Sequence, residues 1–171
     1  MKLRKRWFLI VGGVVMGVFC AGAAWSVLSW SGPDLTQEEQ RIVDLVNDVR
    51  VLDKLPRLKL HQGLTRVARA HAQHMKEQGR LEFPFPAAFQ EELATQADYT
   101  WEKYGMVADV IQGITIEQAF EKWLKVNEPL AEILSIYHED VGVGVVIDQQ
   151  VNDGEPRAVY YVALVFARKK H

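Results

Sequence analysis

The polar part of the chain opens with the hydrophobic period of an amphipathic helix. Thr36 followed by Glu39 is a capping-box pattern, which predicts a helix start. Apolar residues then recur three and four positions apart until a break near Asp53. Asn47 borders this apolar stripe and is expected to bond a neighbouring loop, and Arg50 is expected to pair with an acid.

A second helix is expected over residues 63–78, where apolar residues again recur at helical spacing, and Gly79 would close it. Leu58 and Leu60 precede it and alternate with a lysine, which is typical of a short strand. Residues 82–98 contain two prolines and little periodicity, so we expect a loop with room for one short helix.

The second half of the chain begins with a strand pattern and then returns to helix. Residues 99–111 are rich in aromatic and β-branched residues, which predicts a strand. A third helix is expected to begin at Thr115 or Ile116, followed by a short helical turn around residues 129–135.

Two apolar runs near the C-terminus, residues 141–146 and 159–166, predict an antiparallel hairpin with a loop longer than two residues. Helices followed by a strand, a helix and a hairpin indicate an α+β domain. We expect helices to cover both faces of a small, mainly antiparallel sheet.

An uncharged apolar segment at residues 7–30 follows a basic tip. These 24 residues would span about 36 Å as a helix, and a bilayer core of roughly 30 Å needs about 20 residues. The basic tip predicts a cytoplasmic N-terminus and an exported body. We therefore expect residues 1–30 to be a cytoplasmic tip and transmembrane anchor, residues 31–36 a linker, and residues 37–171 an extracytoplasmic domain.

Cleavage of this segment as a signal peptide is the alternative, because the small residues ending at Ala23 resemble a cleavage site. The apolar run continues to Trp30, which favours an uncleaved, single-pass anchor over a secreted protein. Gly13, Gly17 and Ala21 form a small-residue ridge of the kind that lets membrane helices pack closely. Such residues are also common in membrane helices that have no partner.

Charge and cysteine content narrow the class of protein. Four of the 20 basic residues lie in residues 1–31, where there is no acid, which leaves 16 basic against 22 acidic residues and a net charge of −6 for the remainder. An acidic body repels phosphate, so we exclude nucleic acid as a partner. The single cysteine, Cys20, lies in the apolar segment, and an exported domain without disulfides favours a bacterial envelope protein.

Two histidines, His71 and His74, lie three residues apart on the second predicted helix. On a helical wheel, His71 falls in the middle of the apolar stripe and His74 at its edge. A metal site would need both imidazoles to face one cavity with further ligands. We therefore favour a hydrogen-bonded, partly buried His71, with a pocket-lining role as the alternative.

The order of these motifs resembles the CAP superfamily of cysteine-rich secretory, antigen-five and pathogenesis-related proteins, in particular its bacterial SCP-like extracellular domains. Residues 42–50 resemble the first-helix pattern and residues 58–75 the second-helix signature. Gly105 stands where the Gly-Glu-Asn-Ile strand begins, and Trp123 resembles the third-helix tryptophan. The resemblance spans about residues 37–168 and implies a three-layer α-β-α sandwich.

The resemblance also implies a cleft with two histidines and acidic residues that can hold a divalent cation, and this sequence departs from that pattern. The glutamate that would follow Gly105 is Met106. No histidine follows the second helix, where Phe83 and Phe85 stand, and none occurs in residues 127–130, which face the second histidine. We therefore expect no catalytic residue, no metal and no cofactor.

The remaining candidate residues support binding better than chemistry. Acid–base catalysis needs a titrating group beside the substrate. Glu82 and Glu128 are the nearby carboxylates, and each is expected to be a solvated surface group. The apolar replacements either line a groove or fill core. The candidate ligand-binding residues are Phe83, Phe85, Met106, His71 and Glu128.

The sequence thus favours a membrane-anchored, extracytoplasmic CAP-like domain that binds without catalysis, as a binding module or an accessory subunit of a membrane complex. The expected partners are the lipid bilayer, another membrane protein or a second copy through the anchor helix, and a lipid, peptide or glycan ligand. The alternative function is a hydrolase acting on envelope peptides or peptidoglycan.

Overall fold

The computed structural model describes residues 34–82, 95, 98–152 and 154–170. Four helices and four strands are described in this part of the chain. In chain order they are α1 (Gln37–Leu52), β1 (Lys59–Leu60), α2 (Gln62–Gln78), β2 (Trp101–Gln112), α4 (Ile116–Trp123), α5 (Asn127–Ile133), β3 (Asp140–Asn152) and β4 (Glu155–Lys169).

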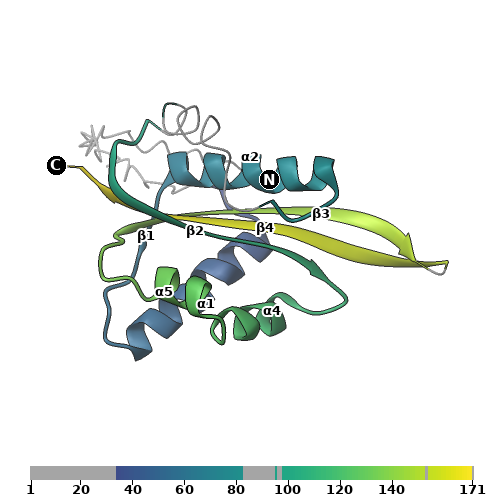
Figure 1. The fold of residues 1–171 in the computed structure, drawn as a ribbon, viewed down its shortest axis with the longest axis horizontal. Helices are drawn as coiled ribbons and strands as arrows, with labels where there is room; N and C mark the ends of the chain where they lie inside the picture. The colour runs from purple at the N-terminus through teal and green to yellow at the C-terminus, as the bar shows by residue number, and fades with distance from the viewer. Residues whose placement is uncertain (1–33, 83–94, 96–97, 153, 171) are drawn as a thin grey trace, which may run out of the picture. The chain divides into compact units, whose positions relative to one another are not determined.

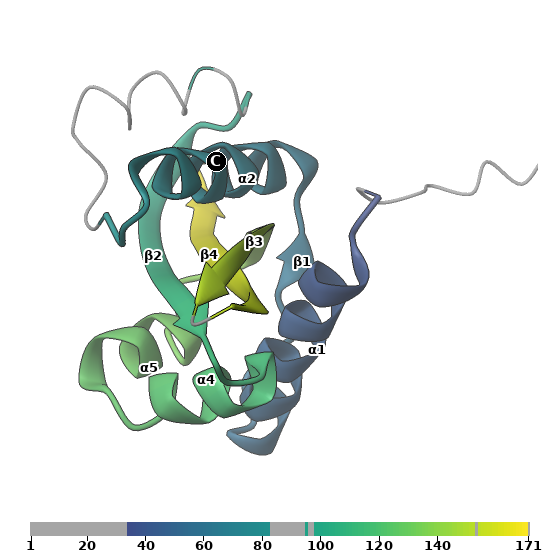
Figure 2. The ribbon, with the colours of Figure 1, turned by 90° about the vertical axis from the view of Figure 1, so that its right-hand side faces the viewer.

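The four strands form one mixed sheet in the order β1-β3-β4-β2. Only the short β1 is parallel to its neighbour, and the β3–β4 and β4–β2 pairs are antiparallel. Helix α2 covers one face of the sheet, and α1, α4 and α5 cover the other (Figures 1 and 2). The predicted α+β sandwich with a mainly antiparallel sheet is confirmed.

Local chemistry fixes the helix ends at the predicted places. Thr36 caps α1 and Thr115 caps α4, each in a complete capping box that satisfies two backbone N–H groups. Gly79 ends α2 with φ of 66°, a left-handed conformation that glycine adopts without steric cost. The predicted loop bond of Asn47 is also confirmed, since its amide pairs with both backbone groups of Leu58.

Each face of the sheet has its own hydrophobic cluster. One cluster packs beneath α1, α4 and α5, and the other beneath α2. Gly142 and Gly144 let α2 approach β3 closely, because a Cβ atom at either position would overlap with the α2 backbone. The sheet therefore separates two cores, and a site on one face shares no side chains with a site on the other.

The hairpin is longer than the sequence suggested. Pairing of β3 with β4 continues to Asn152 and Glu155, so two residues connect the strands, and Gly154 has φ of 82°. The prediction of a longer loop is wrong, because both strands continue past their apolar runs into polar residues such as Gln149 and Gln150.

Within the described ranges no helix is long and apolar enough to cross a membrane. The predicted anchor at residues 1–30, with Gly13, Gly17 and Ala21, lies outside the described residues, as do Phe83 and Phe85.

Candidate functional site

Gly105 and Met106, at which the sequence resemblance places a Gly-Glu pair, face opposite sides of β2. Met106 packs against the cluster beneath α2, together with partly buried neighbours such as Ala108. Gly105 faces α5, and a Cβ atom there would overlap with the carboxylate of Glu132. The Met106 side chain therefore places a thioether in the apolar layer beneath α2.

Glu132 and His138 form a carboxylate–imidazole pair against Gly105. The Glu132 Oε2 and His138 Nε2 atoms are 2.7 Å apart, and the His138 side chain is 4% exposed against 35% for Glu132. The ring of His138 also stacks on Phe166 at a centroid distance of 5.5 Å. Burial lowers the pKa of His138 although Glu132 opposes the shift, so the imidazole is neutral at neutral pH.

This neutral imidazole donates from Nε2 to the Glu132 carboxylate, which leaves Nδ1 as an acceptor. The Nδ1 atom of His138 is buried and has no hydrogen-bond partner among the described residues. The pair could not be predicted from the sequence, because Glu132 belongs to α5, His138 lies in the loop after it, and the space for both comes from Gly105 in β2.

Arg50 holds the segment between α5 and β3 from inside the protein. Its guanidinium is fully buried and donates to the carbonyls of Pro56, Ile133 and Ser135 at 2.8–3.0 Å. A longer bond of 3.5 Å reaches the carbonyl of His138. The expected acid partner is wrong: the charge is solvated by backbone carbonyls, and those of Ile133, Ser135 and His138 lie 83–88 positions away in sequence.

This fixed segment presents large side chains to solvent. Ile136 is 69% exposed and Tyr137 is 47% exposed. The ammonium of Lys103 lies 4.1 Å from the centre of the Tyr137 ring, a cation–π contact. The result is an exposed apolar pair on an immobilised loop, which sequence periodicity could not reveal.

On the other face, His71 and His74 both reach Glu82. The His71 Nε2 atom lies 3.0 Å from the Glu82 carbonyl oxygen, which confirms the predicted hydrogen-bonded role. His71 is fully buried, whereas partial burial was predicted. His74 Nε2 lies 2.8 Å from the Glu82 carboxylate. Burial lowers the pKa of His71 to about 4, so its imidazole stays neutral.

Glu82 lies at the surface as expected, but its carboxylate is only partly exposed to solvent. Its side chain is 19% exposed and is held by Arg80 at 2.9 Å as well as by His74. Hydrogen bonds from Arg80 and His74 lower the pKa of its carboxyl group. Glu128, by contrast, is exposed in the first turn of α5.

The two histidine–glutamate pairs lie on opposite faces of the sheet. His74 belongs to α2 and Glu132 belongs to α5. These two helices lie on opposite sides of the sheet (Figure 1). No group of three His, Cys, Asp or Glu residues that could hold a metal ion occurs within the described ranges.

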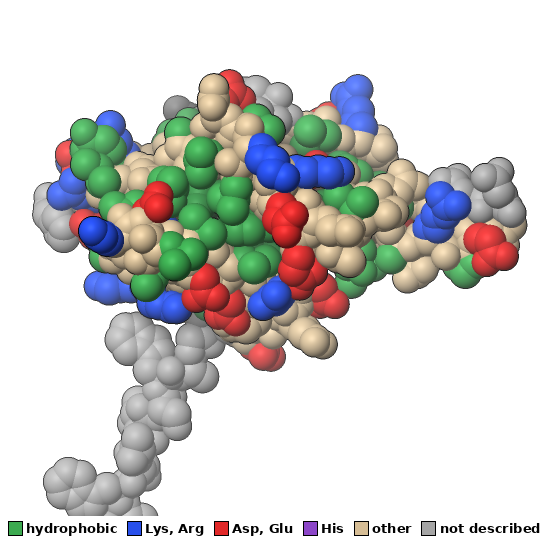
Figure 3. All heavy atoms as spheres, turned by 90° about the horizontal axis from the view of Figure 1, so that it is seen from below, with side chains coloured by type: hydrophobic (Ala, Val, Ile, Leu, Met, Phe, Trp, Pro, Cys, Tyr) green, Lys and Arg blue, Asp and Glu red, His purple; other side chains and the backbone are tan. Residues whose placement is uncertain are grey.

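The face that carries α1, α4 and α5 shows hydrophobic side chains gathered across it, with acidic side chains at their border (Figure 3). Leu45 and Val49 of α1 and Leu124, directly after α4, are partly buried and pack on the core below. The helices on this side thus leave apolar surface accessible as well as supplying core.

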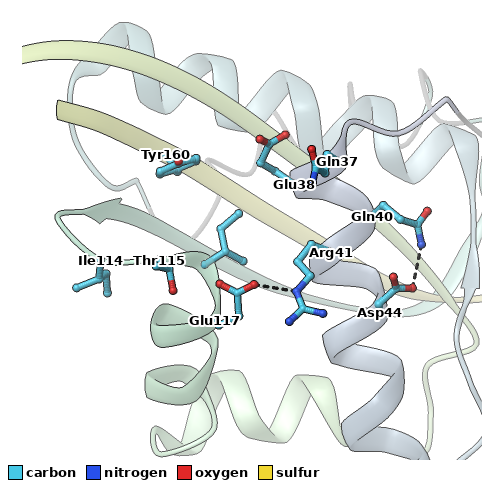
Figure 4. Close-up of a pocket in the computed structure, with 10 residues that line it drawn as sticks. Gln37, Glu38, Gln40, Arg41, Asp44, Ile114, Thr115, Glu117 and Tyr160 are labelled. Carbon is cyan, nitrogen blue, oxygen red and sulfur yellow. Dashed lines mark hydrogen bonds and ion pairs between the residues drawn. The ribbon is translucent and has the colours of Figure 1, made fainter. Parts of the chain in front are cut away.

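A hollow of about 620 Å³ lies between the N-terminal turns of α1 and α4 (Figure 4). Arg41 of α1 and Glu117 of α4 bridge it with an ion pair of 2.8 Å. A second hollow of about 580 Å³ shares Ile114, Thr115 and Tyr160 with it, so the two form one groove that continues toward Arg157. Sequence analysis did not predict this groove, which depends on the packing of α4 beside α1.

Comparison with solved structures identifies similar folds. An outer surface protein of Borrelia burgdorferi matches with a TM-score of 0.60 and 12% identity, covering 80% of this chain and 96% of that protein. An extracellular protein containing an SCP domain from Bacillus anthracis matches with a TM-score of 0.62 and 23% identity, covering 81% of this chain and 45% of that protein. A cysteine-rich secretory protein from Staphylococcus aureus matches with a TM-score of 0.57 and 16% identity, covering 77% of this chain and 39% of that protein.

This chain therefore spans less than half the length of the Bacillus and Staphylococcus proteins. No protein with a curated functional description matches it. The sequence pattern of the CAP family, described as the cysteine-rich secretory protein family, matches residues 43–166, which is well over half of the chain. The chain belongs to the CAP family.

Proposed function

We propose that this protein is a membrane-anchored, extracytoplasmic CAP domain that binds a partner without catalysis, as a binding module or as an accessory subunit of a membrane complex. The apolar segment at residues 7–30, which follows a basic tip, supports the anchor. The similar fold of an outer surface protein and of an extracellular protein supports a body outside the cytoplasm.

Met106 carries the proposal that the domain does no chemistry. A carboxylate at this position could hold a cation or move a proton, whereas a thioether in an apolar cluster does neither at neutral pH. The remaining histidine–glutamate pairs support the same view, because the sheet separates them and they cannot act together on one substrate atom.

The loop held by Arg50 supports the binding role. Exposed aromatic and aliphatic side chains form the energetic centre of many protein interfaces, and an immobilised loop loses little entropy on binding. Ile136 and Tyr137 meet this description, and Lys103 supplies a positive charge against the Tyr137 ring. A protein partner with an apolar pocket would fit this loop.

The test is extraction of the full chain from its native membranes in mild detergent. We expect the intact mass of the uncleaved chain and a stoichiometric partner that is lost when Tyr137 is replaced by Asp, while a matched Tyr104→Asp variant retains it. A soluble protein that lacks the residues up to Ala23 would contradict the anchor. A lone chain in the detergent extract would contradict the subunit role.

One observation favours a second candidate function, a hydrolase acting on envelope peptides or peptidoglycan. Acid–base catalysis needs a titrating group that can reach the substrate. The partly exposed Glu132 carboxylate, hydrogen-bonded at 2.7 Å to the buried His138 imidazole, is such a group. This alternative requires a substrate that reaches Glu132 from the solvent side of α5.

A further inference from the structure

The β3–β4 hairpin extends past the rest of the domain (Figure 1). The last pair of β2 with β4 is Gln112–Val159, whereas β3–β4 pairing continues for four further pairs, from Gln149–Ala158 to Asn152–Glu155. We call residues 149–152 and 155–158 the hairpin arm. A two-stranded ribbon without a third strand is marginally stable in water, so the arm would gain from another strand.

The outer edge of β3 is occupied up to the base of the arm. Val141, Val145 and Ile147 of β3 each direct a backbone group away from β4. Each of these groups forms a hydrogen bond with another part of the domain. The bonds join His61 N–H to Val141 O at 2.9 Å, Val145 N–H to the Glu39 carboxylate at 3.3 Å, and the Lys76 ammonium to Ile147 O at 3.3 Å.

Beyond Ile147 the same edge is open. Since backbone groups alternate along a strand, the N–H and C=O groups of Gln149 and Val151 also point outward. Neither residue has a partner for these groups among the described residues. The Val151 side chain is 71% exposed, which adds apolar surface to the open edge.

The opposite edge of the arm lacks one of its two outward N–H donors, because its outward-facing residues are Pro156 and Ala158. Pro156 stands on β4 opposite Val151, at a position whose backbone nitrogen faces away from β3. Proline has no N–H to donate, and natural proteins use it to prevent unwanted strand pairing. The β4 edge of the arm therefore offers one outward N–H donor, whereas the β3 edge offers two and is the better edge for pairing.

We propose that the open edge of the arm pairs with the same edge of a second copy of this chain. The two β3 strands run antiparallel, with Gln150 opposite Gln150 of the second copy. Gln149 then lies opposite Val151 of the second copy, and each such pair exchanges two backbone hydrogen bonds. The interface is isologous, and the two bodies lie at opposite ends of the paired arms.

A second copy fits this edge better than a free peptide does. The arm of a second copy is already an ordered strand, so it loses less conformational entropy on pairing. The register also avoids like charges, because the one acid in residues 147–152, Asp148, lies opposite Asn152 of the second copy. Lys76 already pairs with Asp148 at 3.4 Å within each chain.

Disulfide trapping in membranes tests the register directly. The full chain carries Cys20→Ser in every variant, so that an introduced thiol is the only one. In the proposed dimer, position 150 is a non-hydrogen-bonded pair with a Cα separation of about 4.5 Å, within reach of a disulfide. We expect Gln150→Cys to give a covalent dimer as the main species after mild oxidation.

Arg157→Cys is the matched control, since Arg157 pairs with Gln150 inside each hairpin. Its symmetry mate would be three strand spacings away, about 14 Å, which no disulfide can span. We expect at least a fivefold lower dimer yield. An equal yield from both positions would mean random collision and would overturn the proposal.

Val151→Pro, combined with Gln150→Cys, tests the backbone bonds themselves. It removes the outward N–H but no hydrogen bond inside the hairpin, so we expect an unchanged melting temperature and at least a fivefold loss of dimer. Retention of the dimer in this variant would overturn the proposal. Failure of Gln150→Cys alone to form a dimer would overturn it as well.

Discussion

Gly105 and Glu132 lie in contact between β2 and α5, and the missing side chain of Gly105 is the space that the Glu132 carboxylate occupies. The same absence lets His138 Nε2 reach that carboxylate at 2.7 Å. The absence of a side chain at Gly105 of β2 therefore makes the Glu132–His138 pair possible.

Gly105→Ala is expected to destabilise the protein by about 1–3 kcal/mol, the usual cost of inserting a methyl group into a packed site. Urea denaturation followed by circular dichroism measures this difference. Because the collision is with Glu132, the double variant Gly105→Ala/Glu132→Ala should cost less than the sum of the two single variants. If the double variant instead loses the full sum of the two single losses, the overlap with Glu132 is not the reason that Gly105→Ala destabilises the protein.

Arg50→Met is expected to cost about 3 kcal/mol or more, since it leaves several carbonyl groups near the core without a donor. Hydrogen exchange should also speed up at the amides of residues 134–139, which Arg50 fixes. Arg57→Met is the control, because the exposed Arg57–Asp48 ion pair contributes about 1 kcal/mol at most. Similar losses from both variants would contradict the role of Arg50.

Glu39 joins three parts of the domain, and its neutralisation is expected to be costly. The buried carboxylate accepts from Thr36 N–H, from Val145 N–H and from the Arg69 guanidinium. Glu39→Gln should lower the free energy of unfolding by about 2 kcal/mol. Glu38→Gln, at the partly exposed position one residue earlier, should leave the urea midpoint nearly unchanged, because no hydrogen bond of the Glu38 side chain joins it to another described part of the domain. A comparable loss there would point to a general charge effect.

Stability is expected to fall as the pH drops from 7 to 5. Burial lowers the pKa values of His71, to about 4, and of His138, so the unfolded chain takes up protons first, below about pH 6.5. The titration of His71 alone should lower the free energy of unfolding by about 2 kcal/mol between pH 7 and pH 5. Urea midpoints measured across the interval check this, and His71→Gln should flatten the profile.

A pH profile for His71→Gln as steep as that of the unchanged chain would contradict the assignment. The carboxyl groups of Glu39, Glu82 and Glu117 have lowered pKa values, so their contribution is lost only as the pH falls below about 4.5. The interval from pH 7 to 5 therefore isolates the histidines.

The parts of the fold that rest on local chemistry could be predicted from the sequence. Thr36 and Glu39 are three residues apart, and Gly79 ends its own helix, so the α1 start and the α2 end follow from short patterns. The hairpin length was mispredicted because Gln149 and Gln150 have weak strand preference and pair only because the neighbouring strand continues.

The candidate site was much less predictable. Arg50 takes its acceptors from residues up to 88 positions away, and the sequence offers nothing to distinguish backbone acceptors from an acid. The Glu132–His138 pair depends on Gly105 in another strand. The placement of His71 in the core was predictable from the helical wheel, whereas the capture of Glu82 by His74 was not.

The central claim is that this CAP domain binds without catalysis, and the most direct measurement is the release of soluble muropeptides from purified peptidoglycan by the full chain. The account predicts no release above that of heat-denatured protein, with or without added Zn²⁺ or Mg²⁺. Release that requires the native protein and disappears in Glu132→Gln would contradict the claim and establish the hydrolase.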